Sequence, residues 1–573
     1  MQNKKITKNG SLKMTKQQLA VLESQAGVKR VIACAGSGKT LVLTQSIIDI
    51  LKNGLCRPDE ILAITFTKNA AENMRQSIKK AVKEKIDFES INIFTFNAFG
   101  NYIICENSFI LGLGKDYKLI NIPKSWQILY EIIKSHHFKN ITIGKDISKF
   151  INGVLNYIWS LKANLINLDD LKDYISYYRQ IVSEFKSKAL QNEELEIAEY
   201  QYDLMRIYSS YEEIKRQNNF IDYHDHVFLP YVLLLSDKKL SSVYKNRFKF
   251  IFVDEFQDSD IAQGYLISLL YNPGFNNLMI VGDDDQGIYS FRGACVENIL
   301  RFNYWDIFSD YEVTDFFLTT NFRSGLNIVK AIDAVIGVNE NRFTKDLEPE
   351  FSQKYSEVLF FSCKTHEKEA DEIIKNIRVL LESGLMLKDI AILARRKRFK
   401  NITGALDKNN LKFELISSKG FFYEPEVLFI ISWLMAINDI NSEIYLLYLL
   451  QSLKYKLSDR DLFFLKKFDY SNGLLFNNWE NSNFNLLDGI INYSINPYLS
   501  TEAKKRLKEF LTEFNFYLGQ AGFLRLSELI SLIFSHSGLS DELRSSFDKS
   551  AKIKIKNVET LIKISSDFEL EQS

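Results

Sequence analysis

Short apolar runs alternate with helical stretches between residues 14 and 105. Strands that alternate with helices in this way predict a parallel α/β sheet. The pattern lapses over residues 106–217, where Lys, Glu, Tyr and Ile are frequent, and strands resume before residue 311. The strand candidates of this first part are residues 28–33, 60–66, 91–94, 248–253 and 278–281.

We therefore expect a first α/β domain made of residues 1–105 and 218–311, interrupted by a helical insertion at residues 106–217. A second α/β stretch follows at residues 312–422, and residues 423–573 are again largely helical, as a second insertion would be. The strand candidates of the second stretch are residues 316–319, 358–362 and 390–394. The predicted fold class is α/β with several domains, in keeping with a chain of 573 residues.

The composition is ordinary for a soluble globular protein, with 46% hydrophobic and 25% charged residues. Lys and Arg (72) balance Asp and Glu (72), which excludes a histone-like polycation but not a local basic groove. Five Cys without CxxC spacing suggest neither a zinc site nor a disulfide framework. We find no apolar signal core at the N-terminus and no apolar stretch long enough to cross a bilayer, so we expect a cytoplasmic protein.

A Gly-rich loop with the sequence ACAGSGKT follows the first predicted strand at residues 33–40. Its glycines let the chain curl so that amide N–H groups face an anion. Lys39 can reach the β- and γ-phosphates of a nucleotide, and the Thr40 hydroxyl can bind Mg²⁺. The residues expected to contact ATP here are Ala35, Gly36, Ser37, Gly38, Lys39 and Thr40.

An acidic pair directly follows the apolar run at residues 248–253. We expect Asp254 to hold Mg²⁺ and Glu255 to take the proton from an attacking water. These two roles of an acidic pair are typical of phosphate-loop NTPases. A surface acidic turn is a poor explanation for two carboxylates placed at the end of a buried strand. Gln257 and Gln286 are neutral groups that could sense a γ-phosphate, although a solvated turn explains each Gln equally well. The segments at residues 33–40, 253–259 and 281–294, in this order, indicate an ATP-driven motor on nucleic acid.

Several segments resemble motifs of superfamily 1 DNA helicases of the UvrD/Rep/PcrA type, and the resemblance runs through most of the chain. MTKQQ at residues 14–18 is similar to the adenine-reading Q motif, with Gln18 as the reader. LTTNFRS at residues 318–324 resembles LxxNYRS. The resemblance implies that Phe322 stacks on adenine and that Arg323 touches the γ-phosphate. The other matching segments are AITFTKNAA at 63–71, TFNAF at 95–99, VDEFQDS at 253–259 and VGDDDQGIYSFRGA at 281–294.

The resemblance implies two RecA-like domains, each with a helical insertion, that bind ATP between them while single-stranded DNA crosses both. It implies a helicase or translocase that moves 3′ to 5′ with ATP and Mg²⁺, in DNA repair or related DNA metabolism. The expected DNA partner is a single strand or a duplex with a 3′ overhang. The residues expected to act in catalysis are Lys39, Asp254, Glu255, Gln286 and Arg323.

Aromatic residues near these motifs suit the binding of single-stranded DNA. Bases stack on aromatic faces at roughly 1–3 kcal/mol each, with little sequence preference. An aromatic side chain in an α/β protein is more often part of the core, so that alternative stands for each candidate. Arg292 could bind phosphate or bridge to ATP. The aromatic candidates are Phe66, Phe96, Tyr289 and Phe291.

Two later segments of the family, TLHxxKGLE-like and VAxTRA-like, are not found in the chain. We therefore expect an incomplete second RecA-like domain and a partial second insertion, with the missing groups supplied by a downstream segment or a partner. This suggests an alternative function, an ATP-dependent single-strand DNA-binding subunit without unwinding activity, in a repair or phage-defence complex. The intact Lys39, Asp254 and Glu255 favour a helicase, whereas the missing segments favour the binding subunit.

Overall fold

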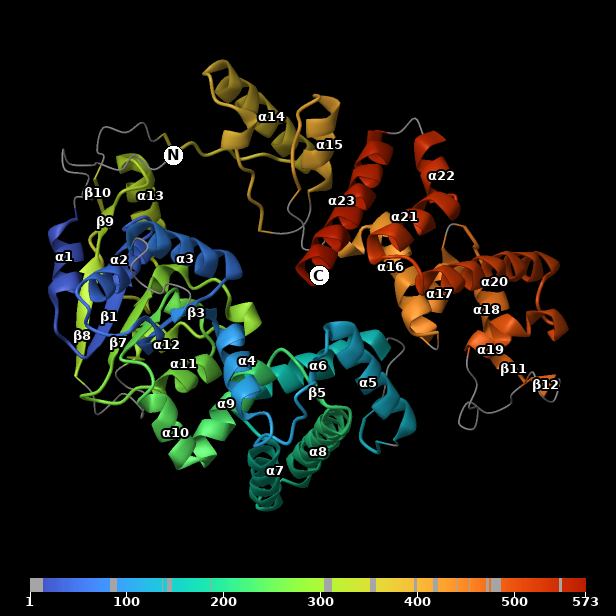
Figure 1. Cartoon of the computed structure of the whole chain (residues 1–573), viewed down its shortest axis with the longest axis horizontal. Coiled ribbons are helices and arrows are strands. Elements are labelled where there is room, and N and C mark those ends of the chain that lie inside the picture. The colour runs from blue at the N-terminus through green and yellow to red at the C-terminus, as the bar shows by residue number, and fades with distance from the viewer. Residues whose placement is uncertain are drawn as a thin grey trace. The chain divides into compact units, whose positions relative to one another are not determined.

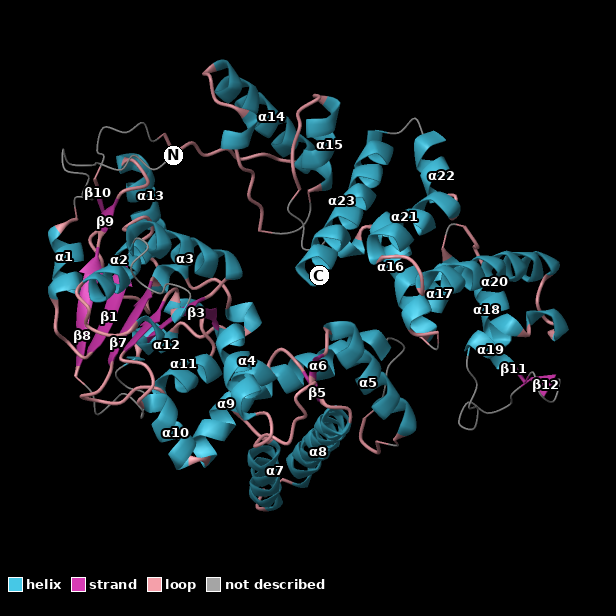
Figure 2. Ribbon diagram, in the orientation of Figure 1, coloured by secondary structure: helices cyan, strands magenta, loops and turns pink. Residues whose placement is uncertain are grey.

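The computed structural model divides the chain into two compact units, Met1–Phe360 and Phe361–Ser573 (Figure 1). In the part of the chain that the structure describes, one sheet has more than two strands, and it lies in the first unit (Figure 2). The structure describes residues 14–82, 90–136, 138–141, 147–185, 187–302, 312–350, 357–395, 399–415, 421–440, 442–452, 454–469, 474–475, 486–545 and 549–572.

A six-stranded sheet lies at the centre of the first unit, in the order β3-β2-β6-β7-β1-β8. Every neighbouring pair of strands is parallel, which confirms the predicted parallel α/β sheet. Parallel strands end at the same edge of a sheet, so the segments that follow β1, β6 and β7 lie close together. The strands are β1 (Val28–Ala33), β2 (Ile61–Thr65), β3 (Asn92–Thr95), β6 (Phe250–Val253), β7 (Asn277–Gly282) and β8 (Val313–Leu318).

Apolar side chains pack on both faces of this sheet. One face is covered by α1, α2 and α3, which bury residues such as Val42 and Met74. The other face is covered by α4, α9 and α11, which bury residues such as Phe99, Val227 and Leu266. Burial on both faces explains why the strands read as nearly continuous apolar runs. These helices are α1 (Lys16–Glu23), α2 (Lys39–Lys52), α3 (Lys68–Val82), α4 (Phe96–Asn107), α9 (Asp225–Ser236) and α11 (Ile261–Ser268). Further helices of this unit are α10 (Lys238–Lys245), α12 (Glu297–Leu300) and α13 (Leu326–Ile336).

Helices also occupy the segment for which the sequence predicts an insertion, and they share a core of their own that includes Leu155, Ile158 and Ile207. The chain enters this body through β4 (Lys118–Leu119) and leaves through β5 (Phe220–Ile221), which pair in parallel. Because entry and exit are adjacent, the helices extend a loop of the sheet domain without interrupting the sheet. The helices are α5 (Ile122–Ser135), α6 (Ile147–Ala163), α7 (Leu168–Ser183) and α8 (Lys188–Gln217).

Two buried lysines attach the insertion to the start of α9. Lys162 Nζ, on α6, lies 3.0 Å from Asp222 Oδ2 and 2.7 Å from Asp225 Oδ1. Lys215 Nζ, on α8, lies 2.9 Å from Asp222 Oδ2. Removal of one partner would leave an uncompensated buried charge. The network therefore fixes the orientation of the insertion on the sheet domain.

The position of β8 corrects the expected start of the second domain at residue 312. The strand predicted at residues 316–319 does form, but it pairs along its length with β1 in the first sheet. Buried Arg30 on β1 donates two hydrogen bonds of 2.7 Å to the Asp315 carboxylate on β8, which reinforces this pairing. An apolar run by itself does not specify the sheet that it joins.

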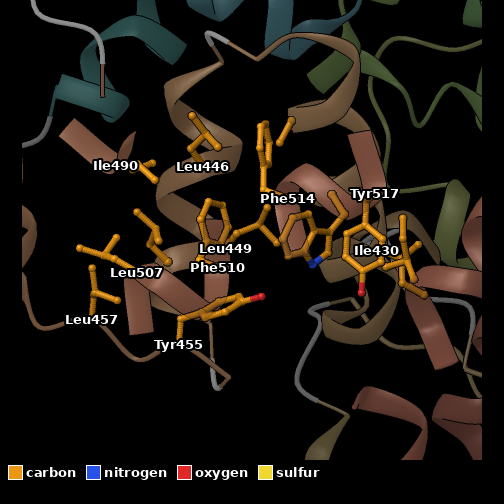
Figure 3. Close-up of a cluster of buried hydrophobic side chains, with 14 of the residues drawn as sticks. Ile430, Leu446, Leu449, Tyr455, Leu457, Ile490, Leu507, Phe510, Phe514 and Tyr517 are labelled. Carbon is orange, nitrogen blue, oxygen red and sulfur yellow. The ribbon is translucent and has the colours of Figure 1, made fainter. Parts of the chain in front are cut away.

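Most helices of the second unit surround a large apolar core (Figure 3), whereas its first two helices share a smaller one. Phe510, Phe514 and Tyr517 from α20 gather in this core with Tyr455, and the Trp433 ring lies 5.2 Å from that of Phe510. The helices are α14 (His366–Glu382), α15 (Lys400–Lys408), α16 (Pro425–Asn438), α17 (Glu443–Gln451), α18 (Asp459–Lys467), α19 (Leu486–Ile491), α20 (Thr501–Ala521), α21 (Leu526–His536), α22 (Leu539–Ser545) and α23 (Lys549–Gln572).

The strands predicted at residues 358–362 and 390–394 are not formed, and both segments are irregular. Phe360 and Leu393 are 91% and 93% exposed. A stretch with high β-propensity becomes a strand only when a neighbour completes its hydrogen bonds, and neither segment has such a neighbour in the described part of the chain. In that part of the chain we also find no helix that is both long and apolar enough to cross a membrane.

Candidate ATP-binding site and nucleic-acid surface

The Gly-rich loop between β1 and α2 curls tightly at two glycines. Gly36 and Gly38 have φ angles of 74° and 88°, in the left-handed region that favours glycine. A Cβ atom on Gly36 would lie 2.7 Å from the Arg323 Cβ, so this position has no room for a side chain. α2 begins at Lys39 directly after Gly38, and no side chain caps its N-terminus. The first N–H groups of the helix are therefore available to an anion, as in a phosphate-binding loop.

The loop meets the acidic pair at the carboxyl edge of the sheet. Lys39 Nζ lies 2.8 Å from Glu255 Oε2, and Thr40 Oγ1 donates a hydrogen bond of 3.2 Å to Asp254 Oδ2. Lys39 and Thr40 begin α2 after the loop that follows β1, and the acidic pair directly follows β6; β7 lies between these two strands in the sheet. The structure thus brings together the side chains that the sequence predicts for phosphate binding, metal binding and water activation.

Asp254 is a buried carboxylate with too few positive partners. Burial and the adjacent Glu255 charge raise the pKa of Asp254 to about 6, although Lys39 and the Thr40 hydroxyl oppose the shift. A cation next to the Asp254 carboxylate and Thr40 Oγ1 would relieve this destabilisation. Both groups offer oxygen ligands, which Mg²⁺ prefers. The residues present therefore fit a magnesium ion at this place.

Gln257 connects the acidic pair to the segment that follows β7. Its Nε2 donates a hydrogen bond of 2.8 Å to Glu255 Oε2, and its Oε1 accepts one of 2.9 Å from the Asp283 N–H. Glu255 itself has a φ angle of 50°, a conformation uncommon for a residue with a side chain. Gln257 is buried, and both ends of its amide bind protein groups. It therefore helps to position Glu255, and its role as a phosphate sensor stays a prediction.

Three consecutive aspartates after β7 share one buried ammonium group. Lys345 Nζ lies 2.8 Å from Asp283, 2.6 Å from Asp284 and 2.7 Å from Asp285. Arg342 adds two hydrogen bonds of 2.9 Å to the Asp285 carboxylate. Sequence reasoning missed both cations. Three adjacent carboxylates near a buried strand signal that positive partners are needed, but they do not say where in the chain these partners lie.

The segment after β8 is hydrogen-bonded to the phosphate loop. Asn321 Nδ2 donates a hydrogen bond of 2.7 Å to the Ala35 carbonyl, and the Phe322 N–H donates one of 2.9 Å to the Gly36 carbonyl. Phe322 is half-buried beside the loop. These bonds place Phe322 where the resemblance expects an aromatic next to the nucleotide.

Gln286 and Arg323 also lie beside the loop. Gln286 donates a hydrogen bond to the Asp283 carboxylate and lines a small cavity of about 70 Å³ together with Ala35. Arg323 is exposed, and its Cβ faces Gly36. Both side chains are therefore near the position that the terminal phosphates of a nucleotide would occupy on the loop.

Gln18, the expected adenine reader, forms hydrogen bonds within the protein. It is buried, its Oε1 accepts a hydrogen bond of 3.0 Å from the Thr15 N–H, and its Nε2 donates one of 3.0 Å to the Ser37 carbonyl. The bond to Oε1 completes the capping box of α1, and the bond from Nε2 joins this helix to the phosphate loop. In this structure Gln18 supports the phosphate loop, and its role as the adenine reader stays a prediction.

Three of the proposed DNA-stacking aromatics form one cluster. The Tyr289 ring lies 5.2 Å from that of Phe66 and 6.0 Å from that of Phe291. Arg292 lies over the Tyr289 ring at 5.3 Å and over the Phe291 ring at 5.7 Å. Phe291 is 77% exposed and Phe66 is half-buried. An exposed aromatic face beside a guanidinium group can accept a base and its phosphate.

Phe96 does not belong to this surface, which corrects its assignment as a DNA-stacking residue. Its side chain is 5% exposed and lies in the core on the α4 face of the sheet, with Phe99 and Ile103. Phe96 is the first residue of α4 and follows β3 directly, so its side chain packs inward against the sheet.

The comparisons with known proteins agree with this geometry. The sequence model of the UvrD/REP helicase N-terminal domain matches residues 14–304, and that of the UvrD-like helicase C-terminal domain matches residues 316–573. The second match does not support our expectation of an incomplete second domain with missing C-terminal motifs. It also gives no support to the alternative of a binding subunit without unwinding activity.

Curated relatives match nearly the whole chain. The ATP-dependent DNA helicase PcrA of Leuconostoc citreum is 26% identical over 560 residues, which cover 97% of this chain and 69% of the relative. The proteins of the same name from Staphylococcus epidermidis and Staphylococcus aureus are each 25% identical over 559 residues. Each match covers 97% of this chain and 70% of the relative. Since one family model alone spans half of the sequence, the chain belongs to the UvrD/REP helicase family.

Proposed function

We propose that this chain is an ATP-dependent DNA helicase or translocase that moves 3′ to 5′ along single-stranded DNA. The observation that carries the proposal is the meeting of Lys39, Thr40, Asp254 and Glu255 at one edge of the sheet. The relatives named above are DNA helicases by name, and the exposed aromatic cluster supports a single-stranded DNA substrate.

In this proposal the phosphates of ATP lie on the loop around Gly36 and Gly38, and Lys39 binds the β- and γ-phosphates. Lys39 is paired with Glu255 in the structure, so the phosphates compete with the Glu255 carboxylate for the ammonium group. Glu255 is then released to accept the proton of the attacking water. Gln257 keeps its hydrogen bond to Glu255 and holds the carboxylate in place.

Asp254 and Thr40 would hold Mg²⁺, which supplies charge neutralisation for the phosphates when bound. Arg323, next to Gly36, and Gln286, beside Ala35, would contact the γ-phosphate. Phe322 would stack on the adenine ring. The hydrogen bonds of Gln257 and Gln286 to residue 283 give a path from the phosphates to the DNA-binding cluster. The state of the nucleotide can therefore change the position of Tyr289 and Phe291.

Displacement of streptavidin from biotinylated single-stranded DNA tests the proposed direction of movement. The full chain, supplied with ATP and Mg²⁺, should displace streptavidin from the 5′ end of an oligonucleotide faster than from the 3′ end. Glu255→Gln is the matched control because it keeps the size of the side chain and removes the proton acceptor. Equal displacement from both ends, or displacement by Glu255→Gln at the wild-type rate, would contradict the proposal.

A further inference from the structure

The helical insertion contains an apolar groove that the proposed helicase cycle does not use. It has a volume of about 510 Å³ and lies between α6, α7 and α8. Tyr174 and Ile197 are 58% and 45% exposed, so the groove is open to solvent. We define the insertion groove by six of its lining residues, Tyr157, Leu161, Leu171, Tyr174, Ile175 and Ile197.

Exposed apolar side chains extend the insertion groove along α7. Tyr177 and Ile181 are exposed and follow Tyr174 by three and seven residues, a spacing that places all of them on one side of the helix. Apolar patches of this kind on a soluble protein, when polar residues surround them, mark sites of interaction with another molecule. A groove between helices, lined by aliphatic and aromatic side chains, suits the apolar face of an amphipathic helix.

Acidic residues surround the insertion groove. On α7, Asp170 lines the groove and Asp173 is exposed four residues before Tyr177, on the same side of the helix. On α8, Glu193 is exposed four residues before Ile197. Each of these carboxylates therefore lies next to an apolar side chain of the groove or of its extension.

The nearby basic residues compensate this charge only in part. Arg179 on α7 is paired with Glu199 on α8 at 2.8 Å, and Lys172 is exposed. The rim of the insertion groove is therefore negative on balance. A negative rim repels the phosphates of DNA and attracts Lys and Arg. A symmetric contact with a second copy of the chain would bring the same carboxylates together.

We propose that the insertion groove binds an amphipathic helix of a protein partner, whose apolar side chains enter the groove while flanking Lys or Arg residues face the acidic rim. This would be a docking site for a recruiting or regulating protein, separate from the ATP site and from the aromatic cluster around Tyr289. Affinity for such a helix should fall as salt increases, because part of the attraction is between exposed charges.

A synthetic peptide tests the proposal with the full chain. The probe is a fluorescent amphipathic helix of about 18 residues, with Leu on one face and Lys on the rest. A second peptide with Glu in place of Lys tests the charge. Ile197→Asp places a carboxylate in the groove at a half-exposed position. Leu235→Asp, on α9 outside the groove and 57% exposed, is the matched control. Circular dichroism and DNA-stimulated ATP turnover report whether both variants stay folded.

We expect Ile197→Asp to weaken binding of the Lys peptide by roughly tenfold or more, the ratio that corresponds to 1.4 kcal/mol. Leu235→Asp should bind it like the wild type, and the Glu peptide should not bind. Equal affinities for the two variants would overturn the proposal. So would a concentration-dependent dimer that Ile197→Asp abolishes, since the occupant would then be a second copy. Competition between the Lys peptide and single-stranded DNA for the groove, relieved by Ile197→Asp, would also overturn it.

Discussion

Lys39 Nζ lies 2.8 Å from Glu255 Oε2, so the cation of the phosphate loop is paired with the proposed general base. Lys39 is buried, whereas the Glu255 side chain is 33% exposed. A phosphate that enters the loop therefore meets an ammonium group that is held near it but already has a partner. We expect this exchange to couple the binding of ATP to the release of the base.

Two substitutions separate the roles of this pair. Lys39→Ala should abolish productive ATP binding, because the phosphates lose their cation. Glu255→Gln should keep ATP binding and lose roughly 100-fold or more in turnover, as expected for removal of a general base. A fluorescent ATP analogue reports affinity, and phosphate release reports turnover. Turnover by Glu255→Gln at the wild-type rate would show that another group accepts the proton.

Phe291→Ala should weaken single-strand binding by roughly 1–3 kcal/mol with little change in ATP affinity. The reason is that Phe291 is exposed at the edge of the cluster with Tyr289 and Arg292. Titration of a labelled oligonucleotide at fixed salt measures the effect. Phe109→Ala removes another exposed ring of the first unit and should leave DNA affinity unchanged. If both variants bind DNA like the wild type, Phe291 is not a stacking residue.

Gln257→Leu should separate ATP binding from the response to DNA. The substitution removes both hydrogen bonds of a buried side chain, those to Glu255 and to the Asp283 N–H. We expect stimulation of ATP turnover by DNA to fall by about tenfold or more, since a hydrogen bond to a charged group contributes about 1.5–3 kcal/mol. Nucleotide affinity, measured in the same preparation, should change little. Full stimulation in this variant would mean that Gln257 has only a packing role.

Phe96→Ala should lower the free energy of unfolding of the first unit by about 3–5 kcal/mol, because it leaves a cavity in a dense core. The residue is buried with Phe99 and Ile103, so the loss arises from packing. Chemical denaturation measures it. The protein that remains folded should bind single-stranded DNA with wild-type affinity. A selective loss of DNA affinity without destabilisation would restore the stacking role that the sequence suggested.

Lys345→Ala should destabilise the segment after β7, because it leaves Asp283, Asp284 and Asp285 without their shared cation. Removal of one partner from a buried charge network typically costs about 3–5 kcal/mol. The three carboxylates have oxygens within 4.8 Å of one another, so a divalent cation could replace the ammonium group. Thermal melting of the variant with excess EDTA measures the loss of stability. Melting with added Ca²⁺ tests whether a divalent cation restores it. A melting temperature equal to that of the wild type in EDTA would contradict this account of Lys345.

Local sequence was sufficient for the sheet that carries the phosphate loop. Each of four strands is an apolar run that is followed by a turn or by charged residues, so both the strands and the residues after them could be predicted. These runs lie around Val31, Ile64, Ile251 and Ile280. The same reasoning failed for residues 358–362 and 390–394, which are as apolar but have no strand beside them in the described ranges. It also failed to assign β8 to its sheet, because pairing depends on contacts far along the chain.

In the proposed ATP site, too, some residues could be predicted from local sequence and others could not. The four polar residues of the proposed ATP site follow predicted strands, so we could expect them to lie close together. They are Lys39, Thr40, Asp254 and Glu255. Lys345 follows Asp283 by many residues, and nothing in its surroundings marks it as a partner. Phe96 and Phe291 are both aromatics within helicase-like segments, and the sequence makes both of them candidates for stacking. Phe96 begins α4 and packs in the core, whereas Phe291 lies in an exposed turn after β7, and only the fold determines this difference.

Strand separation by the purified full-length chain tests the central claim most directly. The substrate is a labelled duplex with a 3′ single-stranded tail, and a duplex with a 5′ tail serves as the comparison. With ATP and Mg²⁺, we predict release of the labelled strand from the 3′-tailed duplex, little release from the 5′-tailed duplex, and none with Glu255→Gln. An absence of strand release under conditions in which the chain binds DNA and hydrolyses ATP would contradict the assignment as a helicase. Preferential release from the 5′-tailed duplex would contradict the proposed direction.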